Sequence, residues 1–231
     1  MPSSTIALTA ADGFQSSAYV SEPAGTPKGA IVVLQEIFGV NAHIRSVADR
    51  YAAAGYLAIA PAMFDRVEKN VDIGYGPEDM KRGSALKAAV ETLPAPGALQ
   101  DVQAAVDWAA KAGKAGKVGV VGYCWGGLLV WRSAEQVRGL SAAVSYYGGG
   151  MTAGSEPART PKVPVMSHFG ELDKHITLES VKAFEQKHPE VEVHLYQADH
   201  GFNCDLRGSW NAGAAATALE RSLFHFGKHV G

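Results

Sequence analysis

The stretch that decides the fold covers residues 117–127 and reads Lys117-Val118-Gly119-Val120-Val121-Gly122-Tyr123-Cys124-Trp125-Gly126-Gly127. Its first half is apolar and β-branched, which is typical of a strand, and an apolar segment with helical spacing follows it. A strand, a glycine-flanked residue and a helix form the sharp turn that lifts one side chain above a sheet. The lifted residue is Cys124. Taken alone, the turn indicates a nucleophile and a buried structural cysteine about equally.

The glycines on either side of Cys124 have a physical reason. Gly122 and Gly126 carry no Cβ, so the strand and the helix can approach each other without a clash. The helix begins just after Cys124, and its positive end therefore lies near the sulfur. That position favours a thiolate and a developing oxyanion. A thiol in this turn predicts acyl transfer through a thioester.

Length and composition limit the possible classes of protein. With 231 residues, 47% of them hydrophobic, we expect one α/β domain over residues 1–231. The net charge of −2 argues against nucleic acid as a partner. Neither a signal peptide nor a membrane span is recognisable, so we expect a cytoplasmic protein, as a monomer or weak homo-oligomer. Two cysteines make neither a disulfide framework nor a paired zinc motif, and we expect no metal or organic cofactor.

Strand and helix patterns alternate along the chain. Strands are predicted at residues 5–8, 16–20, 30–34, 56–60, 117–121, 141–146, 163–169 and 191–196. Helices are predicted at residues 43–54, 77–92, 98–112, 128–134, 178–187 and 209–227. Irregular segments are expected at 62–76 and 148–160. This alternation predicts a mostly parallel central sheet with helices on both faces.

A cysteine nucleophile needs a base, and the base needs an orienting acid. In the α/β-hydrolase fold the chain order is nucleophile, acid, histidine. Asp173 and His200 supply this order, because each follows a predicted strand and lies at the carboxyl edge of the sheet. Other residues could fill the two roles: Glu171 as the acid, and His175 or His168 as the base.

Four motifs carry a family resemblance: Gln35-Glu36-Ile37-Phe38-Gly39, Gly122-Tyr123-Cys124-Trp125-Gly126-Gly127, Gly170-Glu171-Leu172-Asp173 and His200-Gly201-Phe202. With them the chain resembles the dienelactone hydrolase family, the carboxymethylenebutenolidases of α/β-hydrolase fold, over nearly its whole length. Glu36 together with a cysteine in the turn is the most discriminating pair. The resemblance implies hydrolysis of a small ester or enol lactone.

The resemblance also implies roles for four residues. Cys124 would be the nucleophile, His200 its base and Asp173 the orienting acid. Glu36 would lie beside the sulfur, where in the family it is thought to hold the thiol protonated. Substrate binding then moves this carboxylate and helps to ionise the thiol. A thiol that ionises only with substrate bound is less exposed to oxidation.

Further residues are expected around the reacting carbonyl. The fold places the oxyanion donors at the backbone N–H groups of Trp125 and Ile37. Four aromatic residues flank the motifs, and some of them should wall an apolar pocket: Phe38, Tyr123, Trp125 and Phe202. Core packing is the alternative for these rings, and for Tyr123 and Trp125 it is equally favoured.

The sequence defines the acyl group of the substrate less well than it defines the type of reaction. Family members that act on dienelactone hold its carboxylate with two arginines, and Arg82 is in a place comparable to the first. Four residues after the histidine, where the second arginine is expected, the chain has Cys204, and the nearest arginine is Arg207. Arg82 and Arg207 are therefore the predicted substrate-binding residues. Cys204 is expected to be a semi-buried free thiol.

Two alternative functions remain open at this point. A general esterase or thioesterase would use the same residues on a different acyl group. A non-catalytic binding or thiol-sensing protein would keep Cys124 for redox chemistry. The complete set of Glu36, Cys124, Asp173 and His200 argues against a sensor, which would not need a triad.

Overall fold

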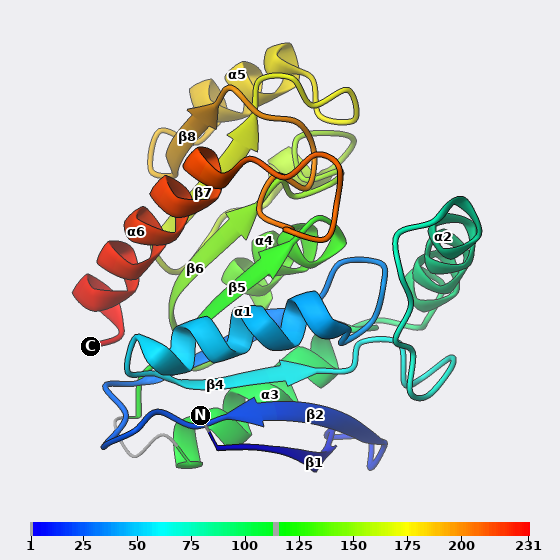
Figure 1. Cartoon of the computed structure of the whole chain (residues 1–231), viewed down its shortest axis with the longest axis vertical. Coiled ribbons are helices and arrows are strands. Elements are labelled where there is room, and N and C mark those ends of the chain that lie inside the picture. The colour runs from blue at the N-terminus through cyan, green and yellow to red at the C-terminus, as the bar shows by residue number, and fades with distance from the viewer. Residues whose placement is uncertain (1, 113–115) are drawn as a thin grey trace.

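The computed structural model of the chain describes residues 2–112 and 116–231. Within these residues an eight-stranded sheet runs in the order β1-β2-β4-β3-β5-β6-β7-β8 (Figure 1). The strands are β1 Ser3–Thr9, β2 Gln15–Ser21, β3 Ala30–Leu34, β4 Leu57–Pro61, β5 Val118–Tyr123, β6 Leu140–Tyr146, β7 Val165–Gly170 and β8 Glu192–Tyr196. From β4 to β8 all neighbours are parallel, whereas β2 pairs antiparallel with β1 and with β4. The predicted, mostly parallel sheet is confirmed.

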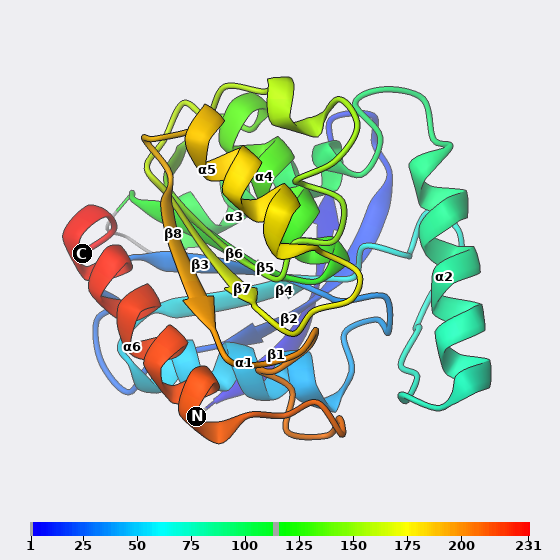
Figure 2. The same ribbon diagram turned by 90° about the horizontal axis from the view of Figure 1, so that it is seen from above.

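Helices cover both faces of this sheet. Their bounds are α1 Ala42–Ala53, α2 Pro77–Glu91, α3 Leu99–Ala112, α4 Trp125–Gln136, α5 Leu178–Lys187 and α6 Ala212–His229, with a short 3-10 helix at Glu156–Ala158. On one face α1 packs on β2, β3 and β4, and α6 packs on β6 and β7. On the other, α3 and α4 pack on the central strands, with α5 beside α4 (Figure 2). Of the helices described, α2 alone stands beside the sheet (Figures 1 and 2).

The central strands explain why the chain folds around them. Every residue of β3, β4 and β5 is buried, as expected for strands that helices cover on both faces. The predicted boundaries differ from the observed ones by a few residues. Pro61, for example, lies just outside the predicted strand 56–60 but is the last residue of β4, where it pairs in register with Ala18. None of the described helices is long and apolar enough to cross a membrane.

Candidate active site

Cys124 lies in the turn between β5 and α4, as the sequence predicts. Its backbone has φ 55° and ψ −115°, a left-handed conformation that is uncommon for a residue with a side chain. The turn is held on both sides, because the Cys124 N–H donates to the carbonyl of Tyr146 at 3.0 Å and the Cys124 carbonyl accepts from Gly149 at 3.1 Å. A strained backbone that its surroundings fix in this way is typical of functional positions.

The flanking glycines are needed for close approach of the backbone. A Cβ at Gly122 would lie 2.2 Å from the carbonyl oxygen of Gly126. A Cβ at Gly126 would lie 2.4 Å from the carbonyl oxygen of Leu34, at the end of β3. The physical reason inferred from the sequence for these glycines therefore holds. The same close packing brings the start of α4 against the loop that follows β3.

His200 and Asp173 lie at the ends of β8 and β7 and contact each other. The Nδ1 atom of His200 is 2.7 Å from Oδ2 of Asp173. Oδ1 of Asp173 accepts the backbone N–H groups of His175 and Ile176 at 2.7 and 3.1 Å, and the carboxylate side chain is only 1% exposed. Because the carboxylate accepts at Nδ1, that nitrogen carries the proton, and Nε2 is left for another partner.

The environment of this pair favours its charged form. Burial lowers the pKa of His200, but hydrogen bonding and charge from Asp173 and Cys124 outweigh it and raise the pKa to about 10. Burial raises the pKa of Asp173, but hydrogen bonds from His200 and two backbone amides outweigh it and lower the pKa. A protonated histidine beside a sulfur atom stabilises a thiolate. The arrangement is therefore suited to nucleophilic attack by sulfur.

Cys124 and His200 open onto one cavity of about 310 Å³. The loop after β3 contributes Ile37 and Phe38, and the loop after β6 contributes Gly149 and Gly150. The remaining lining residues come from α2 and from loops at the carboxyl edge of the sheet: Met80, Ser84, Lys87, His175 and Arg207. This volume would enclose a small organic molecule.

Glu36 and Arg207 form a partly buried ion pair beside this cavity. Arg207 Nη1 donates to Oε1 of Glu36 at 3.0 Å, and the two side chains are 16% and 1% exposed. Burial lowers the pKa of Arg207, but the charge of Glu36 outweighs it and raises the pKa. Gly201 makes room for the guanidinium, because a Cβ there would lie 2.3 Å from Arg207 Nη1. Arg207, which the sequence left uncertain, thus reaches the cavity, and it is the partner of Glu36.

The two backbone N–H groups predicted as oxyanion donors belong to Trp125 and Ile37. Trp125 is the first residue of α4, and the first N–H groups of a helix have no partner within it. Ile37 lines the cavity together with Cys124. The side chain of Trp125 is buried, stacks on Phe64 at 5.2 Å and donates to Glu91 at 2.8 Å. The side chain of Trp125 therefore belongs to the core and not to the cavity wall.

The aromatic residues of the motifs divide between cavity and core. Phe38 lines the cavity, whereas Tyr123 and Phe202 are buried and do not line it. Tyr147, which sequence reasoning missed, packs its ring 5.1 Å from that of His200 and has a φ of 37°. Nothing in the sequence distinguishes Tyr147 from a core residue, because it directly follows Tyr146 at the end of a strand.

The alternative acid and bases occupy other environments. Glu171 is partly exposed and accepts a hydrogen bond from Gln197. His168 is fully buried in the sheet, where it contacts Tyr196 and Ser222 at 2.8 and 3.0 Å, and burial holds its pKa well below the ordinary value. His175 lines the cavity, and its ring lies 5.4 Å from that of His200. Of these residues, only His175 can touch a bound molecule.

Arg82 does not lie where the family resemblance implies. It is on α2, its side chain is 52% exposed, and it pairs with Glu68 outside the cavity. Helical periodicity is the reason, because Met80, Ser84 and Lys87 share the face of α2 that lines the cavity. The cation that α2 presents to the cavity is therefore Lys87, which sequence reasoning missed.

Cys204 is more deeply buried than the sequence suggested. It is 0% exposed and is not among the residues that line the cavity. Burial and the nearby charge of Glu36 raise the pKa of its thiol to about 11. Its sulfur therefore lies beside the site and not in its wall.

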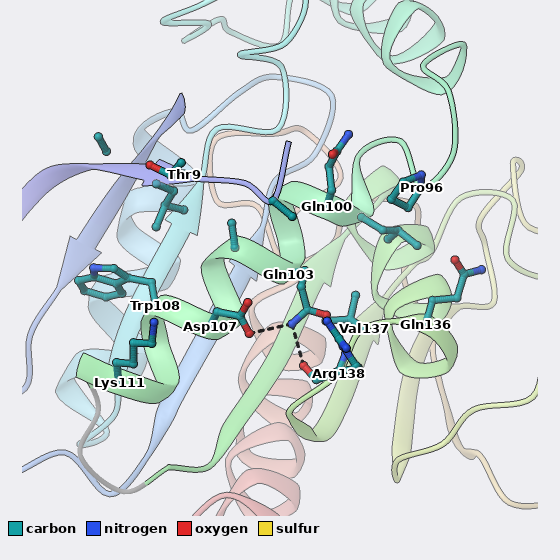
Figure 3. Close-up of a pocket in the computed structure, with 15 residues that line it drawn as sticks. Thr9, Pro96, Gln100, Gln103, Asp107, Trp108, Lys111, Gln136, Val137 and Arg138 are labelled. Carbon is teal, nitrogen blue, oxygen red and sulfur yellow. Dashed lines mark hydrogen bonds between the residues drawn. The ribbon is translucent and has the colours of Figure 1, made fainter. Parts of the chain in front are cut away.

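A larger cavity, of about 620 Å³, lies elsewhere in the molecule (Figure 3). It is lined by residues of β1 and α3 and by residues 136–138. Three of its polar residues are paired with one another, since Gln103 donates to Asp107 at 2.9 Å and to the carbonyl of Arg138 at 3.0 Å. None of the predicted catalytic residues lines it, so the smaller cavity at Cys124 is the candidate active site.

The sheet order, the helices on both faces and the strained turn after β5 define an α/β-hydrolase fold. The model of the dienelactone hydrolase family matches residues 16–230. The chain therefore belongs to the dienelactone hydrolase family, and it is a hydrolase of the carboxylic ester or lactone type. The family resemblance seen in the motifs is confirmed.

Known relatives match over most of their length. The carboxymethylenebutenolidase of Pseudomonas putida is 31% identical over 223 residues, which cover 94% of this chain and 93% of that one. A Synechocystis protein provisionally named carboxymethylenebutenolidase is 33% identical over 223 residues, which cover 90% of this chain and 89% of that one. Among solved structures, a Klebsiella pneumoniae protein provisionally named dienelactone hydrolase has a TM-score of 0.82 and 29% identity, with 99% and 100% covered.

Proposed function

We propose that the protein hydrolyses a small ester or enol lactone through an acyl thioester on Cys124, with His200 and Asp173 as its catalytic partners. The observation that carries this proposal is the convergence of the three residues. His200 is held by Asp173 at 2.7 Å and opens with Cys124 onto one cavity. Order along the chain and position at the strand ends are those of the nucleophile, acid and histidine of the fold.

In the first half of the reaction the Cys124 sulfur attacks the substrate carbonyl carbon. The carbonyl oxygen becomes an oxyanion, for which the backbone N–H groups of Trp125 and Ile37 are the proposed donors. His200 then gives its proton to the leaving oxygen as the carbon–oxygen bond breaks. In a lactone, that oxygen stays attached to the acyl chain.

In the second half His200 takes a proton from a water molecule, which attacks the thioester carbonyl. The carbon–sulfur bond breaks, the carboxylic acid leaves, and the thiolate returns beside a protonated His200. Asp173 keeps the imidazole in the required tautomer and stabilises its positive charge. Glu36 holds Arg207 at the edge of the cavity in the resting state. A substrate that contacts Arg207 would disturb this ion pair and so change the charge near the sulfur of Cys124.

The lining of the cavity favours a substrate that carries a carboxylate. Arg207 and Lys87 both line it and come from different parts of the fold, the loop after β8 and helix α2. Two cations beside an apolar wall suit an acyl group with one negative charge. We propose that Lys87 takes the role that the sequence suggested for Arg82.

Hydrolysis of an activated ester and of an enol lactone by the wild type and by Cys124→Ala tests this proposal. We expect kcat/KM to fall by about 10⁴-fold or more in the variant, because it lacks the sulfur that forms the proposed acyl intermediate. Folding of the variant is checked by its unfolding midpoint. Equal rates in the two proteins would refute the mechanism and leave the membership of the family untouched.

A further inference from the structure

Three side chains with metal-binding chemistry meet beside the cavity. Glu36 follows β3, His43 lies in the first turn of α1, and Cys204 lies in the loop after β8. One ligand atom of each lies within 4.8 Å of the others. All three residues are buried, with exposed fractions of 1%, 1% and 0%. Three segments far apart in the sequence thus bring an oxygen, a nitrogen and a sulfur atom to one point.

Several of these atoms lack a partner in the protein. Oε2 of Glu36 and both ring nitrogens of His43 make no hydrogen bond with any part of the chain that the structure describes. Buried polar atoms are nearly always satisfied in folded proteins, so each exception needs a cause, such as a bound ion. The other oxygen of Glu36 is already used by Arg207. The triad of the proposed reaction does not explain His43 or Cys204.

We propose that Glu36, His43 and Cys204 form a binding site for a divalent transition metal ion, with Zn²⁺ as the ion that fits best. Thiolate, imidazole and carboxylate are the ligands that zinc binds, whereas magnesium and calcium prefer oxygen atoms throughout. Tetrahedral zinc with bonds of roughly 2.0–2.3 Å separates its ligands by roughly 3.3–3.8 Å. The three side chains therefore need to close by at most about 1.5 Å to bind the ion.

Charges of both signs surround the three ligands. Arg207 contacts Oε1 of Glu36. Arg50 is a second positive charge, and burial together with this charge lowers the pKa of His43. Asp205 Oδ1 lies 3.6 Å from Nδ1 of His43, and its side chain is 55% exposed. If the metal ion binds Oε2 of Glu36, the hydrogen bond between Oε1 and Arg207 stays intact. Asp205 is placed to accept the ring N–H that does not face the metal, as carboxylates commonly do, and its exposure gives a route from solvent.

Metal binding replaces a proton and involves no redox step. The S–H bond of Cys204 breaks, the sulfur donates its electron pair to the ion, and the proton leaves to solvent. With Glu36 and Arg207 held by the ion, their movement during catalysis would be restricted, so Zn²⁺ should inhibit hydrolysis. This last consequence rests on the proposed function, whereas metal binding itself does not.

A titration of the Cys124→Ser variant with Co²⁺ as the spectroscopic probe tests the site. The chain has two cysteines, so in this variant Cys204 is the only thiol. We expect one equivalent of Co²⁺ to give the near-ultraviolet band of a cobalt thiolate together with the visible bands of tetrahedral cobalt, and Zn²⁺ to displace it. A titration of the folded variant without the thiolate band would overturn the proposal, whatever the outcome for ester hydrolysis.

Second substitutions in this background assign the other ligands. Cys204→Ser should abolish the thiolate band, and His43→Gln should weaken Co²⁺ binding by about 100-fold. His229→Gln is the matched control, because the ring of His229 lies 4.8 Å from that of His225 on α6 and this pair could hold a metal without any thiolate. Equal weakening by His43→Gln and His229→Gln, or a band that survives Cys204→Ser, would contradict the assignment.

Discussion

The cavity beside Cys124 has two walls that hold their side chains in different ways. One wall is the carboxyl edge of the sheet, where Cys124, Asp173 and His200 follow β5, β7 and β8. Their positions are fixed by strand register, by the strained turn and by the hydrogen bond between His200 and Asp173. The proposed chemistry depends on this wall.

The other wall is helix α2, which stands beside the sheet (Figure 1). It packs closely at Gly83, where a Cβ would lie 2.1 Å from the carbonyl oxygen of Ile37. Its cavity face carries Met80, Ser84 and Lys87, and Met80 is 37% exposed. Such side chains can change without disturbing the core. The comparison suggests that the reaction type is fixed by the sheet edge and the choice of acyl group by α2.

The largest effect is expected from a change in the sheet-edge wall. Asp173→Asn should lower kcat/KM by about 10³-fold for charged and neutral esters alike, because the imidazole loses its orienting acceptor. Glu171→Gln is the matched control, since this neighbouring carboxylate is partly exposed and hydrogen-bonded to Gln197. Steady-state kinetics with both variants measures the effect. A similar loss in both variants would remove Asp173 from the proposed triad.

His200, in the same wall, should make the free energy of unfolding depend on pH. The pKa of His200 is raised to about 10 in the folded protein, so the folded state holds this proton more tightly than the unfolded state does. The stabilisation is therefore complete below the unfolded pKa of about 6.5 and is lost as pH rises through about 10. Between pH 7 and pH 10 we expect about 3 kcal/mol of it to disappear.

The difference in unfolding free energy between the wild type and His200→Gln isolates this contribution. Measured in urea across that pH range, it should shrink as pH rises, because groups common to both proteins cancel. A difference that stays constant or grows with pH would show that His200 does not carry the raised pKa.

A smaller and more selective effect is expected from α2. Lys87→Ala should lower kcat/KM by about tenfold for esters that carry a carboxylate and leave neutral esters unchanged, because one ionic contact is lost. Arg82→Ala is the control on the same helix, since Arg82 is exposed and pairs with Glu68. Kinetics with matched charged and neutral esters separates the two variants. If Arg82→Ala reproduced the selective loss, α2 would present a different face during catalysis.

The sequence predicts most of what lies at the sheet edge. Order along the chain, strand ends and flanking glycines locate Cys124, Asp173 and His200, because strand register determines which residues reach that edge. The sequence is less informative about α2. Arg82 and Lys87 are both cations on this helix, and which of them faces the cavity depends on how the helix packs. Long-range pairs are also hidden, since Glu36 and Arg207 are 171 positions apart. The meeting of His43 with Cys204 is likewise a product of tertiary packing.

The most direct test of the account is to find the acyl group on the protein. The enzyme is mixed with an activated ester, quenched in acid within the first turnovers, and analysed by mass spectrometry of the intact chain and its peptides. We predict an added mass of one acyl group, located on Cys124 and released by hydroxylamine as a thioester. Rapid hydrolysis by an enzyme that carries no acyl group on Cys124, with the same rate in Cys124→Ala, would contradict it.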